Sequence, residues 1–194
     1  MSFRIEEKLL IGTDQILEFK DFLMSKSAKQ IYHPRIIKSL YFENSHNEMY
    51  EDSIEGITPR KKIRVRNYPE DKNSTLYLEF KISSVEGRFK TRKIIDEENF
   101  RQIKKIGIND NQYGLCKPLI NVVYRREYYQ MKDTRISIDE DIKFSLYSGR
   151  NLGRERSSIV EIKASINKDL DDLVNDFSFQ RIRFSKYCIG FEKI

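Results

Sequence analysis

Charged and apolar residues alternate along many short segments of this chain, and this alternation constrains the fold more strongly than any other feature. In the first such segment, Arg4, Glu6 and Lys8 occupy one parity, whereas Ile5 and Leu9 occupy the other. Successive side chains of a β-strand point to opposite faces of its sheet, so residues two apart share a face. The pattern therefore predicts a sheet with one apolar face and one charged face.

The same periodicity predicts the order of the elements along the chain. We expect strands at residues 3–11, 36–42, 61–68, 74–82, 88–95, 119–130, 134–139, 142–146 and 158–164. Apolar residues at helical spacing predict helices at 14–25, after Asp96 and from Asn167, with a further helical turn at 184–189. Residues 44–59 are polar and predict a loop with one helical turn at 49–53. Together these elements indicate a single domain, residues 1–194.

The charged face is biased in sign when all the predicted strands are compared. It carries twelve Arg or Lys and four Asp or Glu, whereas ordinary soluble surfaces mix both signs. The cations are Arg4, Lys8, Lys62, Arg64, Arg66, Lys81, Arg88, Lys90, Arg92, Arg126, Arg135 and Lys163, and the carboxylates are Glu6, Glu79, Asp139 and Glu161. Solvent exposure explains such a face on one strand, but the bias favours a closed antiparallel barrel with the charged face inward and helices over the apolar face.

A charged interior of this kind also predicts a ligand. Twelve cations in one lumen would repel one another without a counter-charge, so the interior needs a polyanion. A chain of phosphates fits, because Arg binds phosphate oxygens in a bidentate geometry. The carboxylates on the same face, Glu6, Glu79, Glu161 and Asp139, are natural oxygen ligands for Mg²⁺ or Mn²⁺.

Composition limits the other classes of function. Charged residues make up 34% of the chain and only 12 of 194 residues are Gly or Pro, which argues against a disordered protein. Cys116 and Cys188 lie far apart without nearby histidines, so they predict neither a zinc site nor a redox site. The sequence has no signal pattern and no run of roughly 18 apolar residues, so we expect a soluble, cytoplasmic protein without direct membrane insertion.

A series of motifs, taken in order, resembles a known family over nearly the whole chain. The motifs are Arg4-x-Glu6-x-Lys8, Ser39-Leu40-Tyr41-Phe42, Lys62-x-Arg64-x-Arg66, Glu79-Phe80-Lys81, Lys90-Thr91-Arg92, Tyr124-Arg125-Arg126-Glu127, Arg135-Ile136-Ser137-Ile138-Asp139, Glu161-Ile162-Lys163 and Ser185-Lys186-Tyr187. The sequence resembles the VTC-type polyphosphate polymerase domain of the triphosphate tunnel metalloenzymes, which are CYTH-like proteins. The resemblance implies an α+β, mainly β fold. The implied core is a closed antiparallel eight-stranded β-barrel with a polar interior, covered by about three to four helices.

The resemblance also implies a reaction and a set of site residues. The reaction is transfer of the γ-phosphate of ATP to a growing polyphosphate chain, with Mn²⁺ or Mg²⁺ as cofactor. The implied catalytic residues are Lys8, Arg64, Arg66, Arg126, Arg135 and Lys186. The implied phosphate-binding residues are Lys62, Lys81, Lys90, Arg92, Tyr124 and Lys163, and the metal ligands are Glu161 and then Glu6. Lys62 and Arg92 fit the mouth of the tunnel equally well.

Other functions stay open at this point. A triphosphatase of the same fold would hydrolyse an inorganic or organic triphosphate with an activated water, and Glu79 is then the candidate base. A non-catalytic polyphosphate-binding domain would keep the cations without turnover. Tyr41, Tyr77 and Tyr124 lie near basic strands, but no aromatic RNA-binding signature accompanies them, so nucleic acid is not an expected partner. The donor nucleotide and the oligomeric state stay open as well.

Overall fold

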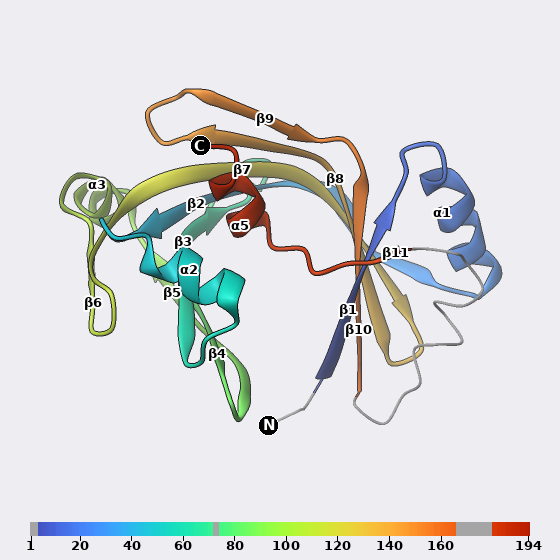
Figure 1. Cartoon of the computed structure of the whole chain (residues 1–194). Coiled ribbons are helices and arrows are strands. Elements are labelled where there is room, and N and C mark those ends of the chain that lie inside the picture. Colours follow the sequence, from blue (N-terminus) through green and yellow to red (C-terminus); the bar gives the residue numbers. More distant parts are fainter. Residues whose placement is uncertain (1–3, 72–73, 166–179) are drawn as a thin grey trace. The chain divides into compact units, whose positions relative to one another are not determined.

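The structure is a computed structural model of the chain, and it describes residues 4–71, 74–165 and 180–194 (Figure 1). The chain divides into two compact units. Unit 1 comprises Met1–Arg35, Tyr124–Ile142 and Arg154–Phe184. Unit 2 comprises Ile36–Val123, Lys143–Gly153 and Ser185–Ile194. Three long strands contribute residues to both units: β2 (Lys29–Glu43), β7 (Gly114–Met131) and β8 (Thr134–Leu146).

Among its described residues, unit 1 has a sheet with one charged and one apolar face, and helix α1 packs on the apolar face. Its own elements are β1 (Arg4–Ile11), α1 (Ile16–Ser25), β10 (Ser158–Ser165) and β11 (Gln180–Arg181). Strand β10 pairs antiparallel with both β1 and β8. The core collects apolar side chains of α1 and of one strand parity: Leu9, Ile11, Ile16, Phe19, Leu23, Ile136, Ile138, Val160 and Ile162. The predicted separation of the two faces is therefore confirmed in this unit.

The described residues of unit 2 form a meander of antiparallel strands with helices α2, α3 and α5. Its elements are α2 (Glu48–Glu55), β3 (Arg60–Asn67), β4 (Leu76–Ser84), β5 (Gly87–Ile95), α3 (Glu97–Ile106), β6 (Ile108–Asp110) and α5 (Lys186–Phe191). Strands β2, β3, β4 and β5 pair in that order. The helix predicted after Asp96 is α3, and Asp96 is its cap, because the Asp96 carboxylate accepts a hydrogen bond from the Asn99 backbone N–H at 2.7 Å.

The predicted closed eight-stranded barrel is wrong for the part of the chain that the structure describes. In the described residues the sheet has eleven strands, in the order β11-β1-β10-β8-β7-β2-β3-β4-β5, with β6 beside β7 and with β9 (Asn151–Glu155) beside β8. The order ends on β11 and β5, and no pairing among the described residues joins these two strands. Alternation reports which face a side chain occupies but carries no information on which edge strands pair, so it could not establish closure.

Several boundaries also differ from the predicted ones. Strand β2 begins at Lys29 rather than at residue 36, and β8 runs without a break through residues 134–146. The single helical turn expected at 49–53 is the full helix α2. Strands β6, β9 and β11 were not predicted, because segments of two to five residues give too few alternations to recognise.

Two further predictions concern helices. The helix predicted from Asn167 lies outside the described residues. The helical turn predicted at 184–189 is α5, whose cap is the Ser185 hydroxyl; it accepts a hydrogen bond from the Cys188 backbone N–H. Among the helices of the described chain, none combines the length and the apolar character that a membrane crossing requires.

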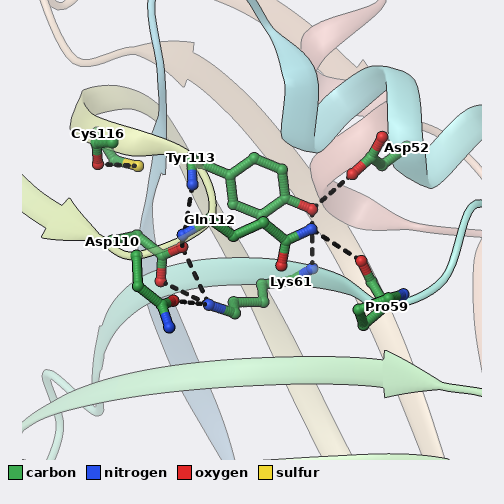
Figure 2. Close-up of polar contacts among 9 residues, drawn as sticks. Asp52, Pro59, Lys61, Asp110, Gln112, Tyr113 and Cys116 are labelled. Atoms are coloured by element: carbon green, nitrogen blue, oxygen red, sulfur yellow. Dashed lines mark hydrogen bonds and ion pairs between the residues drawn. The ribbon is translucent and has the colours of Figure 1, made fainter.

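The turn between β6 and β7 is joined to the start of β3 and to α2 by a polar network (Figure 2). Both Asp110 carboxylate oxygens lie 3.0 Å from Lys61 Nζ, and one of them also accepts the Gln112 and Tyr113 backbone N–H groups. The Tyr113 hydroxyl donates to the Asp52 carboxylate at 2.7 Å. These contacts hold β3, the strand that carries Lys62, Arg64 and Arg66, at one of its ends.

Candidate functional site

The strand register of unit 2 places the predicted site residues in cross-strand rows. Lys62 is paired with Lys81 and Lys81 with Lys90, which gives one row. In the neighbouring row, Arg64 of β3 is opposite Glu79 of β4, and Glu79 is opposite Arg92 of β5. Residues paired across antiparallel strands share a face, so five of the predicted cations of this unit lie on one surface together with Glu79.

This surface is not an ordinary solvent-exposed face. Arg64 is 5% exposed and Glu79 is 0% exposed. The Arg64 Nε and Nη2 atoms donate to Glu79 Oε2 at 2.8 Å and 2.6 Å. Lys90 Nζ lies 2.8 Å from Glu79 Oε1, and Arg92 Nε lies 3.4 Å from the same oxygen. One buried carboxylate therefore faces three cations, and the cluster has an excess of positive charge.

The charge excess lowers the pKa of Glu79. Burial by itself raises the pKa of this carboxyl, but the positive charges of Arg64 and Arg66 outweigh burial and lower the pKa from 4.5 to about 2. A carboxylate with such a low pKa is a poor proton acceptor at neutral pH. The role of Glu79 as a general base, considered for hydrolysis, has no support in this geometry; Glu79 is a counter-charge.

Tyr41 of β2 lies on the same face, opposite Arg64 in the register. Its hydroxyl accepts a hydrogen bond from Arg64 Nη1 at 3.0 Å. Burial raises the pKa of Tyr41, but the nearby charges of Arg64 and Arg66 outweigh it, so the pKa is below its ordinary value. A tyrosine hydroxyl surrounded in this way donates readily to an anion.

The C-terminal helix α5 brings Lys186 to this cluster. The positive charge of Lys186 contributes to the lowered pKa of Tyr41. The position of α5 is fixed by Tyr187, whose hydroxyl donates to the buried carboxylate of Glu43 and whose ring lies 5.4 Å from that of Tyr41. Lys62 Nζ donates to the Ser185 hydroxyl at 2.9 Å, so a predicted phosphate-binding lysine is also in contact with the helix cap.

The remaining predicted residues of unit 2 are more accessible. Lys81, Lys90 and Arg92 are exposed, and the Arg92 guanidinium stacks 3.3 Å from the centre of the Tyr77 ring. The positive charge therefore extends from the buried Arg64 to these exposed side chains, and a surface of this extent suits an anion longer than a single phosphate.

In unit 1, the two predicted metal ligands lie on the charged face of β1 and β10. Lys8 is paired with Glu161, and Glu6 is paired with Lys163. Lys163 Nζ contacts Glu161 and lies 3.7 Å from Glu6 Oε2. Burial raises the pKa of Glu161, but the charges of Arg126, Lys163 and Lys8 outweigh it and hold the pKa well below its ordinary value.

The donor chemistry of this pair fits a divalent metal ion. Glu161 and Glu6 share one ammonium group, so two hard oxygen donors already converge on a cation. In residues 4–71, 74–165 and 180–194 no group of three His, Cys, Asp or Glu side chains forms a metal cage. A Mg²⁺ or Mn²⁺ ion here would therefore take its other ligands from phosphate and water, as these ions commonly do.

Arg126 and Asp139 form a second ion pair on the charged face of unit 1. Arg126 Nη2 donates to Asp139 Oδ2 at 2.6 Å and Nε contacts the other oxygen. Asp139 is 0% exposed, and both of its carboxylate oxygens contact the Arg126 guanidinium. Tyr124 is buried beside Arg126, with its ring centre 5.3 Å from the guanidinium carbon.

Arg135 differs from the other arginines of unit 1. Its guanidinium carbon lies 5.1 Å from the centre of the Tyr128 ring, and among the described residues no carboxylate forms an ion pair with it. An arginine whose guanidinium is supported by a ring and has no anionic partner is suited to bind an external anion.

The structure thus assembles the predicted residues in two clusters. Unit 1 holds Glu6, Lys8, Tyr124, Arg126, Arg135, Glu161 and Lys163, and unit 2 holds Lys62, Arg64, Arg66, Lys81, Lys90, Arg92 and Lys186. Sequence reasoning did not assign a role to Glu43, which fixes Tyr187, or to Ser39, whose hydroxyl accepts from Arg66 Nε. Both share the parity of Tyr41, and parity was the signal that could have found them.

Comparisons with known proteins identify a family for the chain and solved structures of similar fold. A sequence profile described as the VTC domain matches residues 3–194. No curated protein matches the chain. HpAC1 from Hippeastrum, described as having a dominant triphosphatase activity, is 13% identical with a TM-score of 0.62, covering 98% of this chain and 96% of that one.

Two other solved structures are similar at comparable levels. A Bacillus halodurans protein named as a candidate adenylate cyclase is 12% identical with a TM-score of 0.63, covering 95% of this chain and 94% of that one. A chain of the Schizosaccharomyces pombe Mediator head module is 10% identical with a TM-score of 0.57, covering 92% of this chain and 99% of that one. At these identities the likeness extends to the fold alone.

Proposed function

Because this chain belongs to the VTC domain family, we propose that it is a metal-dependent polyphosphate polymerase that uses ATP as the phosphoryl donor. The observation that carries the proposal is the charge excess around Glu79 in unit 2, where this one buried carboxylate faces the three cations Arg64, Lys90 and Arg92. Such an excess is stable only with an anion bound or with solvent nearby, and a phosphate chain supplies several charges at regular spacing.

The proposed reaction is a direct transfer. A terminal oxygen of polyphosphate attacks the γ-phosphorus of ATP, a new P–O bond forms, the bond to the β–γ bridging oxygen breaks, and ADP leaves. The attacking oxygen is already ionised, so no general base is required. Arg64, Arg66 and Lys186 would hold phosphates in unit 2 with Lys62, Lys81, Lys90 and Arg92. In unit 1, Lys8, Arg126, Arg135, Tyr124 and Lys163 would do the same.

The proposal assigns a divalent metal to Glu161 and Glu6. A bound Mg²⁺ or Mn²⁺ ion would neutralise phosphate charge when the substrate enters. The chain's own contribution is to keep the Glu161 carboxylate ionised, which the charges of Arg126, Lys163 and Lys8 do. The same proposal includes a cytoplasmic location, where ATP is the available donor.

The surroundings of Glu79 and Asp139 favour transfer over hydrolysis. A triphosphatase needs a carboxylate that can accept a proton from water, but Glu79 has a pKa of about 2 and Asp139 is held by Arg126. These carboxylates act as counter-charges. Transfer to an ionised phosphate acceptor requires no such base.

The product formed from ATP tests the proposal. Purified protein incubated with ATP and Mn²⁺ should yield long-chain polyphosphate and ADP, detected by gel electrophoresis with a polyphosphate stain. Release of orthophosphate or tripolyphosphate as the sole product would contradict a polymerase and identify a triphosphatase.

A matched variant separates catalysis from binding. Glu161→Gln removes the proposed metal ligand and keeps the shape of the side chain, so turnover should be lost while tripolyphosphate binding persists. The control Glu18→Gln changes an exposed residue of α1 and should retain turnover. Equal effects of both substitutions on turnover would contradict the assignment of Glu161 as a metal ligand. Wild-type protein that binds tripolyphosphate but does not turn over ATP would be a polyphosphate-binding domain.

A further inference from the structure

We propose that Tyr32, Tyr128, Arg35 and Arg135 of unit 1 form a platform that binds the nucleobase of the phosphoryl donor. This inference rests on the proposed function, because it assigns a binding site to the nucleobase of the donor, which the phosphate-binding residues do not contact. The four residues come from β2, β7 and β8, which are neighbours in the sheet order. We call this group the aromatic platform.

The aromatic platform is a compact group of rings and guanidinium groups. The Tyr32 and Tyr128 rings meet edge to face, with centroids 5.4 Å apart and an interplanar angle of 84°. The Arg35 guanidinium carbon lies 5.4 Å from the Tyr32 centroid and 5.1 Å from the Tyr128 centroid. Arg135 lies 6.0 Å and 5.1 Å from the same two centroids. The Arg35 Nη2 atom also donates to the Tyr128 hydroxyl at 3.5 Å.

The two tyrosines have different exposure, and this difference assigns their roles. Tyr128 is 5% exposed, so it is the fixed support of the group. Tyr32 is 50% exposed, so half of its surface is available to a ligand while its neighbours restrict its orientation. A pre-oriented exposed ring loses little conformational entropy when a planar ligand stacks on it.

The charges of the aromatic platform select an anionic ligand. The neighbouring Arg126 is neutralised by Asp139, but among the described residues Arg135 has no carboxylate partner. The contacts of Arg135 are ring faces, which leave the N–H edge of its guanidinium for phosphate oxygens. A planar aromatic group joined to phosphates fits both features, and a nucleoside triphosphate has this chemistry whereas inorganic tripolyphosphate lacks the planar part.

The same protein offers a matched control for an exposed tyrosine. Tyr147 is 45% exposed, close to the value for Tyr32, and in the described part of the chain it makes no ring or cation contact. Substitution of Tyr147 therefore removes a comparable exposed ring that has no supporting partners.

Calorimetric titration of the full chain with two probes tests the platform. The probes are a non-hydrolysable ATP analogue and inorganic tripolyphosphate, both with Mn²⁺. Tyr32→Ala should weaken binding of the ATP analogue about 5- to 150-fold, the range for loss of one base–aromatic stack. It should leave tripolyphosphate binding unchanged. Tyr32→Phe keeps the ring and should bind both probes as the wild type does, and Tyr147→Ala should do the same.

The outcomes separate this inference from the proposed function. Tyr32→Ala could weaken binding of both probes equally or change binding of neither, and either result would overturn the aromatic platform. The proposed phosphate site would still stand if the wild type binds tripolyphosphate. Failure of the wild type to bind either probe would overturn both. A wild type that binds the ATP analogue through Tyr32 but forms no polyphosphate would support the platform and contradict the polymerase.

Discussion

Glu79 is the residue on which the charge balance of unit 2 depends. One of its carboxylate oxygens accepts hydrogen bonds from Arg64, and the other forms ion pairs with Lys90 and Arg92. The side chain is fully buried. Because the carboxylate is the counter-charge of a buried arginine, it contributes to the stability of the fold as well as to the electrostatics of the site.

Replacing Glu79 with Gln should destabilise the protein. The substitution leaves Arg64 buried without its anionic partner, and loss of one member of a buried pair costs about 3 kcal/mol of unfolding free energy. Urea denaturation at pH 7 measures this change. The control Glu86→Gln changes an exposed residue of the β4–β5 turn and should stay within about 0.5 kcal/mol of the wild type. A stable Glu79→Gln variant would show that the arginines do not need this charge.

The same residue predicts a dependence of stability on pH. The pKa of Glu79 is about 2 in the folded protein and 4.5 ordinarily, so the unfolded chain binds the proton more readily. The stability that the ionised Glu79 contributes is therefore present above about pH 4.5 and is lost as pH falls toward 2. The stability difference between wild type and Glu79→Gln should shrink over this window. A constant difference from pH 7 to pH 2 would contradict the assignment.

At the scale of elements, the contact between α5 and α2 decides where Lys186 lies. The Glu43 carboxylate accepts backbone N–H groups of Met49 and Tyr50 at 3.2 Å and 3.0 Å, and it also accepts the Tyr187 hydroxyl. The Tyr50 and Phe191 rings stack with centroids 4.0 Å apart. Burial raises the pKa of Glu43, and the hydrogen bond from Tyr187 opposes that shift.

Removing the Tyr187 hydroxyl should loosen α5. Tyr187→Phe leaves a buried carboxylate with one donor fewer, which costs about 1–3 kcal/mol of unfolding free energy. It should also weaken tripolyphosphate binding, because Lys186 follows the helix, whereas the control Tyr147→Phe should change neither quantity. Thermal denaturation and calorimetric titration measure the two effects. Unchanged tripolyphosphate binding in a destabilised Tyr187→Phe variant would assign a purely structural role to this contact.

The polar network of the β6–β7 turn makes a separate prediction at the same scale (Figure 2). Asp110→Asn removes the charge that faces Lys61 and weakens the acceptor of two backbone N–H groups. Unfolding free energy should fall by about 1–3 kcal/mol. The comparison variant Asn111→Ala removes only the hydrogen bond that the exposed Asn111 side chain accepts from Lys61, and it should cost less than Asp110→Asn. Equal losses of unfolding free energy for the two variants would contradict a specific contribution of the Asp110 carboxylate.

At the scale of the whole molecule, the long strands β2, β7 and β8 each contribute residues to both units. A strand that loses its pairing in one unit loses the backbone constraint that it provides to the other. The prediction that residues 1–194 form one domain can therefore be tested by thermal unfolding.

Thermal unfolding should be a single cooperative transition. The calorimetric and van't Hoff enthalpies should agree, as they do for a two-state domain. Tripolyphosphate, which binds the folded state, should raise the midpoint in proportion to the logarithm of its concentration. Two resolved transitions would show that the units unfold independently and would contradict a single domain.

The alternation of residues determined much of what the structure contains. It identified most strands, the apolar face under α1 and the charged parity that holds Arg64, Glu79 and Glu161. These features depend on the period of two, which is a property of the local backbone. The predicted site residues accordingly fall on the charged faces of the two units, apart from Lys186, which the helix α5 supplies.

Tertiary structure alone decided which charges are neutralised and how the edge strands pair. By parity, Glu79, Asp139 and Glu161 were equivalent candidates for metal ligands. Contacts between strands pair Glu79 and Asp139 with arginines, whereas Glu161 and Glu6 both contact the Lys163 ammonium group. The contact of Arg135 with Tyr32 likewise joins residues about 100 positions apart in the chain. Pairing across strands is a long-range property, so a local periodicity cannot specify it.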